Sequence, residues 1–165
     1  MKKFGIFYGS QTGTTADIAA RIAKKLGVDA ADVHNVAAAA PSAVGDYENL
    51  IFATSTWGSG DVEVDWLDFL DALKAMDLRG HRVALVGVGD ETMADTFCSG
   101  VGIIYDKLKN SGAYFIGSYP ADVYKFNHSD AIVDGQPVGL LLDETNHADL
   151  TDGRIDGWLL NVGQY

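Results

Sequence analysis

Cysteine and long hydrophobic runs are both scarce in this sequence. Cys98 is the one cysteine among 165 residues, so no internal disulfide can form and a disulfide-stabilised scaffold is excluded. Such cysteine usage is typical of a reducing compartment. The apolar stretch that follows Met1 ends before Ser10, which is too short for a secretory signal or a bilayer span. We therefore expect a cytoplasmic protein with no membrane association.

Positive charge is absent from two long windows of the chain. The sequence has 12 Lys and Arg against 23 Asp and Glu, a formal net charge of −11, and residues 26–73 and 83–106 contain no basic residue. A surface of this kind repels nucleic acid and anionic membranes and attracts a basic partner. Ordinary solubilising charge is the alternative explanation of the same imbalance.

Charged side chains are also missing from residues 9–15, a turn between an apolar stretch and an amphipathic one. The turn reads Gly-Ser-Gln-Thr-Gly-Thr-Thr and carries four hydroxyls. Because unpaired N–H groups and the positive end of a helix favour an anion, we interpret it as a phosphate-binding loop. No Lys follows Gly13, which argues against a nucleoside triphosphate, and the dinucleotide-binding Gly-x-Gly-x-x-Gly is absent. The alternative is a Thr-rich turn that caps a helix. The candidate phosphate-binding residues are Ser10, Gln11, Thr12, Gly13, Thr14 and Thr15.

Short apolar strands alternate with amphipathic helices along the chain. This pattern predicts an α/β fold, a three-layer α-β-α sandwich in which helices cover both faces of a parallel sheet. At 165 residues the chain is most simply a single domain, 1–165. Ligands of such sheets bind beyond the carboxyl ends of the strands, where we expect the loops 9–15, 54–61 and 89–95 to meet. Strands are expected near residues 3–8, 31–36, 50–53, 82–89, 114–117 and 138–142, and the last helix over about 149–162.

At these three loops the sequence resembles flavodoxins, small electron-transfer proteins that carry FMN. The motifs of the resemblance are Gly9–Thr15, Thr56-Trp57-Gly58 and Gly87–Glu91, followed in the last third by Tyr124–Asn127, Val138–Leu140, and Leu142–Glu144 with Asn146. The later motifs resemble the long-chain branch of that family. The resemblance covers essentially the whole chain. It implies a five-stranded sheet in the order 2-1-3-4-5, with FMN at the switch point and residues 119–139 as an insertion that splits the last strand.

The resemblance also implies which side chains bind the flavin. Trp57 would stack on one face of the ring. On the other face, long-chain flavodoxins usually place a Tyr shortly before an Ala-[Asp/Glu]-x-Phe motif, whereas this chain has Met93 ahead of Ala94. Methionine covers a ring by dispersion and sulfur–aromatic contact but has no plane to stack. The implied flavin-binding residues are Thr54, Ser55, Thr56, Trp57, Gly58, Gly89, Asp90, Met93, Asp95 and Phe97.

A carrier of single electrons, rather than an enzyme, is the function that the resemblance implies. Non-covalently bound FMN would shuttle between semiquinone and hydroquinone at low potential. Trp57 would favour the oxidised ring, Gly58 would allow a peptide flip toward the semiquinone, and the acid-rich windows would oppose the reduced anion. A rim tryptophan and a simple turn glycine are the alternatives for these two residues. The implied partners of this monomer are basic-surfaced redox proteins, such as a flavodoxin/ferredoxin-NADP reductase or a low-potential acceptor enzyme.

Two other functions fit parts of the pattern. An FMN-dependent NAD(P)H oxidoreductase of the quinone or azo reductase type uses the same fold, and Met93 in place of an aromatic residue would open space for its substrate. A receiver-type signalling module would need a phosphoacceptor Asp at the end of the third strand, where the chain has Thr54-Ser55-Thr56, so the sequence argues strongly against this class. The four histidines lack metal-ligand spacing. Cys98 is expected to be a core residue, and Asp143-Glu144 to be solvated charges.

Overall fold

Parallel pairing of short apolar strands builds the middle layer of the molecule. The computed structural model describes all residues from Met1 to Tyr165. Strand β1 (Lys2–Gly9) lies between β2 (Val33–Asn35) and β3 (Tyr47–Trp57), and β5 (Arg82–Val88) lies beyond β3; each of these neighbouring pairs is parallel. The middle of β1, β3 and β5 is a continuous run of buried residues, as expected for strands that are covered on both faces.

One edge of the sheet is occupied by two short strands in line with each other. Strand β6 (Tyr114–Ile116) pairs with residues 82–84 of β5, and β9 (Leu140–Leu142) pairs with residues 86–88 of the same strand. Between them the chain forms the antiparallel hairpin β7 (Ile132–Val133) and β8 (Gln136–Pro137). The segment 117–139 therefore leaves the sheet and returns to the same edge position.

The expected sheet of five strands in the order 2-1-3-4-5 is wrong in its strand number. The sheet has seven strands: five follow the path β2-β1-β3-β5-β6, and β9 and a two-residue strand β4 (Asp61–Val62) pair with β5 and β3 off that path. Strand β4 pairs antiparallel with the end of β3, with Trp57 opposite Asp61. Two residues are too few to show an alternating pattern, so the sequence offers no signal for β4. The predicted α/β class with a parallel sheet is confirmed.

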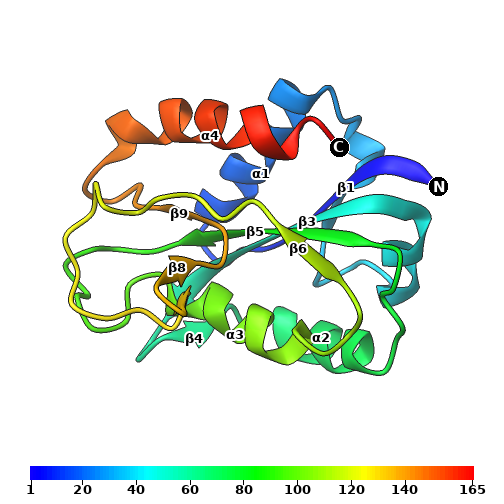
Figure 1. The fold of residues 1–165 in the computed structure, drawn as a ribbon, viewed down its shortest axis with the longest axis horizontal. Helices are drawn as coiled ribbons and strands as arrows, with labels where there is room; N and C mark the ends of the chain where they lie inside the picture. The colour runs from blue at the N-terminus through cyan, green and yellow to red at the C-terminus, as the bar shows by residue number, and fades with distance from the viewer.

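Two helices cover each face of the sheet (Figure 1). Helices α1 (Thr14–Leu26) and α4 (Ala148–Val162) lie on one face, and α2 (Trp66–Lys74) and α3 (Ser99–Leu108) on the other. Two 3₁₀ turns, Ala30–Asp32 and Pro41–Asp46, complete the regular structure. Helix α1 buries Ile18, Ala19, Ile22 and Ala23, the face expected from its spacing, and ends at Gly27 in the left-handed region (φ 72°). No helix is both long and apolar enough to cross a membrane.

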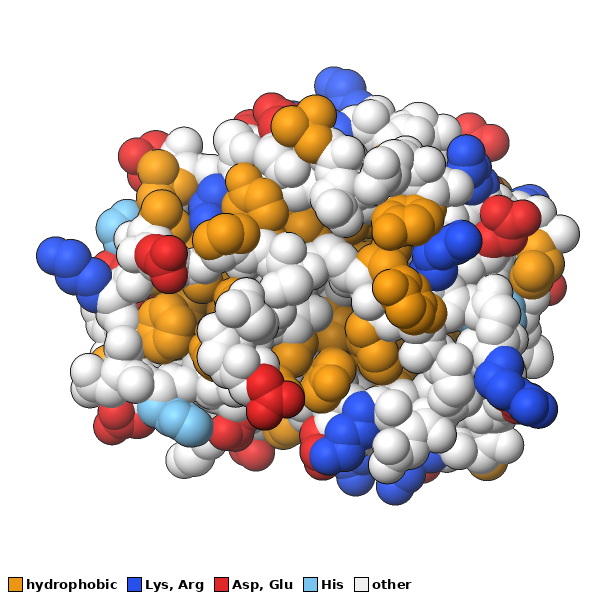
Figure 2. Space-filling view, in the orientation of Figure 1, with side chains coloured by type: hydrophobic (Ala, Val, Ile, Leu, Met, Phe, Trp, Pro, Cys, Tyr) orange, Lys and Arg blue, Asp and Glu red, His pale blue; other side chains and the backbone are white.

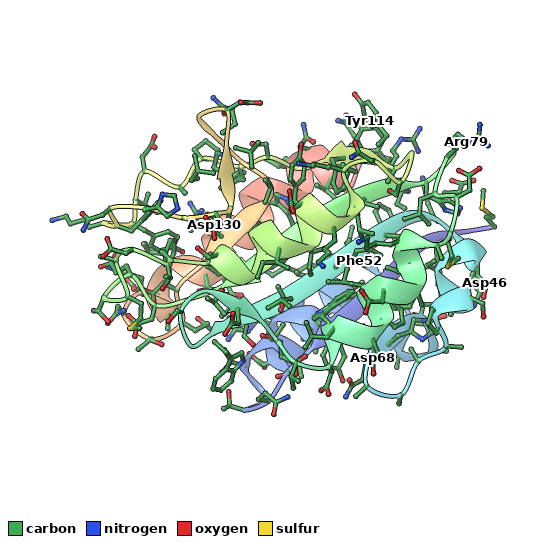
Figure 3. The ribbon with its side chains drawn as sticks, turned by 90° about the horizontal axis from the view of Figure 1, so that it is seen from below. Asp46, Phe52, Asp68, Arg79, Tyr114 and Asp130 are labelled. Carbon is green, nitrogen blue, oxygen red and sulfur yellow. The ribbon has the colours of Figure 1, made fainter.

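The sheet separates two hydrophobic cores. The core under α2 and α3 includes Phe52, whose ring lies 5.2 Å from that of Trp66. The core under α1 and α4 includes Trp158, whose indole N–H donates to the Gly117 carbonyl (2.9 Å). Figure 3 looks onto α2 and α3 and shows Phe52 in the interior, while Asp46 and Arg79 lie at the periphery. Because β1, β3 and β5 pair in parallel, their carboxyl ends lie at the same edge of the sheet.

A hollow of about 490 Å³ lies beside the edge strand β6. Its apolar lining includes Tyr114 and Phe115 of that strand and Pro137 of β8, and Figure 2 shows apolar side chains gathered across this face. This hollow shares no lining residue with the one at the carboxyl ends of β1, β3 and β5.

Candidate functional site

Four loops meet around a hollow of about 300 Å³ at the carboxyl edge of the sheet. Three of them follow β1, β3 and β5, as predicted, and the fourth follows β9. Nine of the predicted site residues line the hollow: Thr12, Thr14, Ser55, Thr56, Trp57, Gly58, Gly89, Asp90 and Met93. The remaining predicted residues lie beneath or beside it.

The loop after β1 leaves the amino terminus of α1 open. Gly13 precedes the helix with φ 93°, a conformation that favours glycine, and no side chain caps the helix. Ser10 Oγ accepts the N–H of Gly13 (3.1 Å) and so shapes the turn. Thr15 is buried, and its Oγ1 has no hydrogen-bond partner. Since the first N–H groups of a helix also lack internal partners, the loop presents several neutral donors to one place.

A buried acid lies directly behind this loop. Glu63 is fully buried; its Oε1 accepts from the Asp65 N–H (3.1 Å) and from the side-chain amide of Gln11, while its Oε2 has no partner. A side chain at Gly9 would collide with Glu63 Oε2, so this position requires glycine. Burial raises the pKa of the Glu63 carboxyl. Gln11 thus contacts Glu63 and does not line the hollow.

The loop after β3 presents one partly exposed aromatic side chain. Trp57 is 40% exposed, and its indole N–H donates to Ser55 Oγ (2.7 Å), which orients the ring. Gly58 adopts φ 53°. Thr56 Oγ1 accepts the N–H of Gly100 (3.0 Å), which ties the loop to α3. Thr54 is buried beneath the loop, where its hydroxyl accepts the N–H of Glu63 (3.2 Å), so it supports the site from below.

The loop after β5 brings an exposed methionine to the hollow that Trp57 also lines. Met93 is 54% exposed and lines the hollow together with Asp90. Asp95 does not line it: its carboxylate accepts from the Asn127 amide (3.3 Å) at the surface. Phe97 lies in the core instead, with its ring 4.8 Å from that of Phe126. The structure therefore does not bring Asp95 and Phe97 to the hollow.

Five lining residues are absent from the predicted set: Val88, Thr96, Cys98, Glu144 and Thr145. Burial raises the pKa of the Cys98 thiol, which keeps it protonated and agrees with the expected core role. Glu144 and Thr145 come from the loop after β9, and the expectation that Asp143-Glu144 are solvated charges is wrong. Asp143 is fully buried, and Glu144 pairs with Arg21 (2.6 Å).

The lining of the hollow carries negative charge only. Asp90 and Glu144 are its charged residues, and no Lys or Arg is among the lining side chains. Hydrogen bonds from Thr92 and from the Asn146 amide lower the pKa of Asp90, so Asp90 is ionised at neutral pH. Arg21 forms an ion pair with Glu144 and offsets its charge, whereas Asp90 has no basic partner.

Comparisons with known proteins agree on one family. The family model described as Flavodoxin matches residues 6–158. A flavodoxin from Nostoc sp. is 40% identical over 162 residues, which is 98% of this chain and 95% of that protein. Flavodoxin 1 of Azotobacter vinelandii is 40% identical over 164 residues, 96% of this chain and 94% of that protein.

Solved structures give the same result. The flavodoxin of Fusobacterium nucleatum bound to flavin mononucleotide has a TM-score of 0.88 at 34% identity, covering 97% of this chain and 96% of that one. A mutant of the same protein, also bound to flavin mononucleotide, reaches 0.91 with 99% and 96% covered.

Replacing Glu63 by Gln should make the protein more stable at pH 8 relative to wild type. A carboxyl whose pKa is raised in the folded state stabilises the fold at low pH and loses that contribution as the pH rises through the folded pKa. The glutamine that replaces it carries no charge at any pH. The expected gain at pH 8 is on the order of 1 kcal/mol, and it should vanish near pH 4.

The measurement is urea unfolding of the cofactor-free protein at both pH values. Asp71→Asn is the matched control, because Asp71 is an exposed acid in α2 and its replacement removes one charge without removing a buried one. An equal gain from both variants would show that net charge, rather than burial of Glu63, sets the pH dependence.

Proposed function

The chain belongs to the flavodoxin family, and from that premise we propose that the hollow at the carboxyl edge holds FMN in a one-electron carrier of the long-chain type. The protein is an electron-transfer protein rather than an enzyme. When bound, FMN supplies the reversible one-electron chemistry, while the protein binds, orients and electrostatically biases it. The segment 117–139 between β6 and β9, both paired with β5, supports the long-chain assignment.

The observation that carries the proposal is the open amino terminus of α1. FMN ends in a single phosphate, and the loop after β1 offers uncapped helix N–H groups with the hydroxyls of Thr12 and Thr14 at the hollow. The buried Thr15 Oγ1 has no partner within the protein, although buried hydroxyls are usually hydrogen-bonded. A phosphate oxygen would supply the missing partner. Neutral donors alone suffice for one phosphate, whereas a triphosphate would require a cation.

The other end of the hollow suits a flat, largely apolar ring system. Trp57 and Met93 come from different loops, are both substantially exposed, and line the same hollow. Exposed large apolar side chains that converge on one hollow are a signature of ligand binding. We assign Trp57 as the stacking residue and Met93 as the dispersive cover, with Ser55 holding the indole in place.

The charge of the lining favours a low reduction potential. An added electron would enter a site with Asp90 and without Lys or Arg. At ~10 Å and an effective dielectric of ~20, one carboxylate opposes one added negative charge by roughly 1.7 kcal/mol before salt screening. Flavodoxins pass electrons to redox partner proteins, and the net charge of −11 supports docking to basic partner surfaces.

The alternative of an FMN-dependent NAD(P)H oxidoreductase is not favoured. The similar proteins named above are flavodoxins. The hollow also lacks any Lys or Arg that could bind the phosphates of a dinucleotide.

The proposal is tested by titrating the cofactor-free protein with FMN while following flavin fluorescence, followed by a redox titration. We expect tight binding of FMN, weaker binding of riboflavin, and reduction in two separate one-electron steps. A protein that takes up no FMN would overturn the proposal. Sustained NAD(P)H oxidation by the purified protein alone would support the oxidoreductase instead.

Replacing Thr15 by Val should weaken binding of FMN roughly ten- to a hundredfold, the value of a hydrogen bond to a charged group. Valine has nearly the same shape as threonine but cannot donate to a phosphate. Riboflavin, which lacks the phosphate, is the matched control ligand, and its affinity should not change. Equal losses for both ligands in the fluorescence titration would indicate that the variant disturbs the loop itself.

Replacing Met93 by Tyr should tighten FMN binding roughly two- to tenfold, because an aromatic plane adds stacking energy to the contact. The control is Leu67→Tyr: Leu67 is 50% exposed in α2 but does not line the hollow, so its variant should bind FMN as wild type does. Unchanged or weaker binding by the Met93 variant would mean that this side chain does not lie over the ring.

A further inference from the structure

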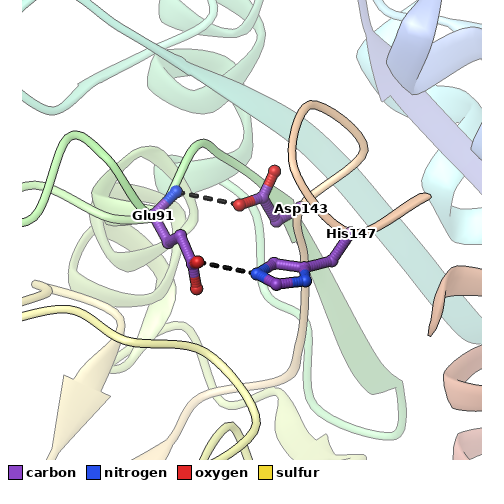
Figure 4. Close-up of side chains that lie close together, drawn as sticks. All are labelled: Glu91, Asp143 and His147. Atoms are coloured by element: carbon purple, nitrogen blue, oxygen red, sulfur yellow. Dashed lines mark hydrogen bonds and ion pairs between the residues drawn. The ribbon is translucent and has the colours of Figure 1, made fainter. Parts of the chain in front are cut away.

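Glu91 connects the loop after β5 to two distant segments of the chain. Its backbone N–H donates to Asp143 Oδ2 (3.0 Å), and its Oε1 lies 2.6 Å from His147 Nε2, as Figure 4 shows. Its Oε2 accepts the N–H of Lys125 (2.8 Å), in the segment between β6 and β9. One residue thus joins the loop of Asp90 and Met93 to the residue preceding α4 and to the 117–139 segment.

The side chains of Glu91, Asp143 and His147 lie close enough together to suggest a metal site, but Asp143 has no free lone pair for an ion. Its Oδ1 accepts the N–H groups of Thr145 (3.0 Å) and Asn146 (2.9 Å). Its Oδ2 accepts from Glu91 N–H and from the Asn146 side-chain amide (2.9 Å). A carboxylate accepts about four hydrogen bonds, so Asp143 is saturated. The cluster is therefore a structural junction.

We propose that Glu91, with His147 as its charged partner, is a positioning residue that holds the loop 89–95 in the shape that receives the cofactor. The proposal rests on the function proposed above. It assigns to the pair a share of the cofactor affinity, although neither side chain lines the hollow.

The loop depends on such outside contacts because its own are few. Within it, Met93 N–H donates to the Asp90 carbonyl (3.0 Å), and Thr92 donates to the Asp90 carboxylate. At its far end, the Ala94 carbonyl accepts the N–H groups of Asn127 (2.7 Å) and His128 (3.0 Å). At its near end, the Gly89 N–H donates to the Leu142 carbonyl (2.9 Å) and the Asn146 amide donates to Asp90 (2.7 Å). Glu91 adds the contacts to Asp143, Lys125 and His147. Loosening one end would require FMN binding to order the loop, which lowers the affinity.

The strength of this junction should depend on pH through His147. The hydrogen bond that His147 donates to Glu91 raises the pKa of His147, and the bonds that Glu91 accepts from the Lys125 N–H and from His147 lower the pKa of Glu91. Both members are charged in the window between the two pKa values. The charge-assisted bond is lost as the pH rises through the folded pKa of His147. The groups that face the pair are Asp143, Asp149, Lys125 and the Tyr124 ring, 5.7 Å from the imidazole.

The experiment compares FMN dissociation constants of His147→Gln and wild type from pH 6 to pH 8.5. Gln accepts and donates hydrogen bonds but stays neutral. We expect the ratio of variant to wild-type dissociation constants to be about two to five at pH 6, the range for a partly exposed ion pair, and to fall to about one at pH 8.5. Taking the ratio cancels the ionisation of the FMN phosphate near pH 6, which is common to both proteins.

His128→Gln is the matched control. His128 lies 3.0 Å from Asp130, and both side chains are exposed. Only the backbone N–H of His128 contacts the loop, and the variant keeps that N–H, so this side-chain pair resembles the first without holding the loop. Its ratio should stay near one throughout. Proton NMR of wild type and Glu91→Gln provides a second readout: the His147 resonance should titrate at higher pH in wild type than in the variant.

A pH-independent ratio for His147→Gln, or an unchanged His147 titration in Glu91→Gln, would overturn the positioning role while wild type still bound FMN. Failure of wild type to bind FMN at every pH would overturn the proposed function instead. The two failures are therefore distinguishable.

Discussion

The open amino terminus of α1 is the constraint on which the rest of the site depends. A helix that begins without a side-chain cap leaves several N–H groups and one positive dipole end without partners, and here they face the carboxyl edge of a parallel sheet. Gly13 permits the turn, and the absence of a side chain at Gly9 leaves room for the Glu63 carboxyl behind it. With no lysine in the loop, an anion would be held by hydrogen bonds and the helix dipole alone, so a small change in the shape of the loop would lower the affinity for it.

Local patterns predict the elements that are long and periodic. The 3.6-residue spacing of α1 and the apolar runs of β1 and β5 identify these elements, and the order of strands and helices indicates where the loops meet. The two-residue strands β4, β7 and β8 carry no periodic signal. Strand β3 extends to Trp57 because its pairing with β4 continues the ladder past the buried core. Pairing with another strand determines these short strands and the end of β3, and the periodic pattern of a segment does not reveal such pairing.

The site could be predicted only in part, for similar reasons. Residues at the carboxyl end of a strand, or within a few positions after it, reach the hollow, as Thr12, Trp57 and Met93 do. Phe97 does not, because it is buried and packs against the rings of Tyr124 and Phe126. The alternation rule fails at Asp143, because this residue lies just beyond β9 in a turn that its own carboxylate caps. The buried Asp143 carboxylate accepts the Glu91 N–H of the loop after β5, more than 50 positions earlier in the sequence.

The acids around the site differ in whether each is paired with a basic side chain, and that difference affects the electrostatic potential in the hollow. Glu144 is backed by Arg21 of α1, and Glu91 by His147 just before α4. Neither Arg21 nor His147 lines the hollow. Asp90 has only neutral partners, Thr92 and Asn146, so its charge is not cancelled. The same loop therefore carries one acid that fixes its position and another that acts on whatever charge enters the site. Because positioning and electrostatic bias fall to different acids, the loop can be held firmly without a cation beside the cofactor. A cation there would favour the added electron and raise the reduction potential.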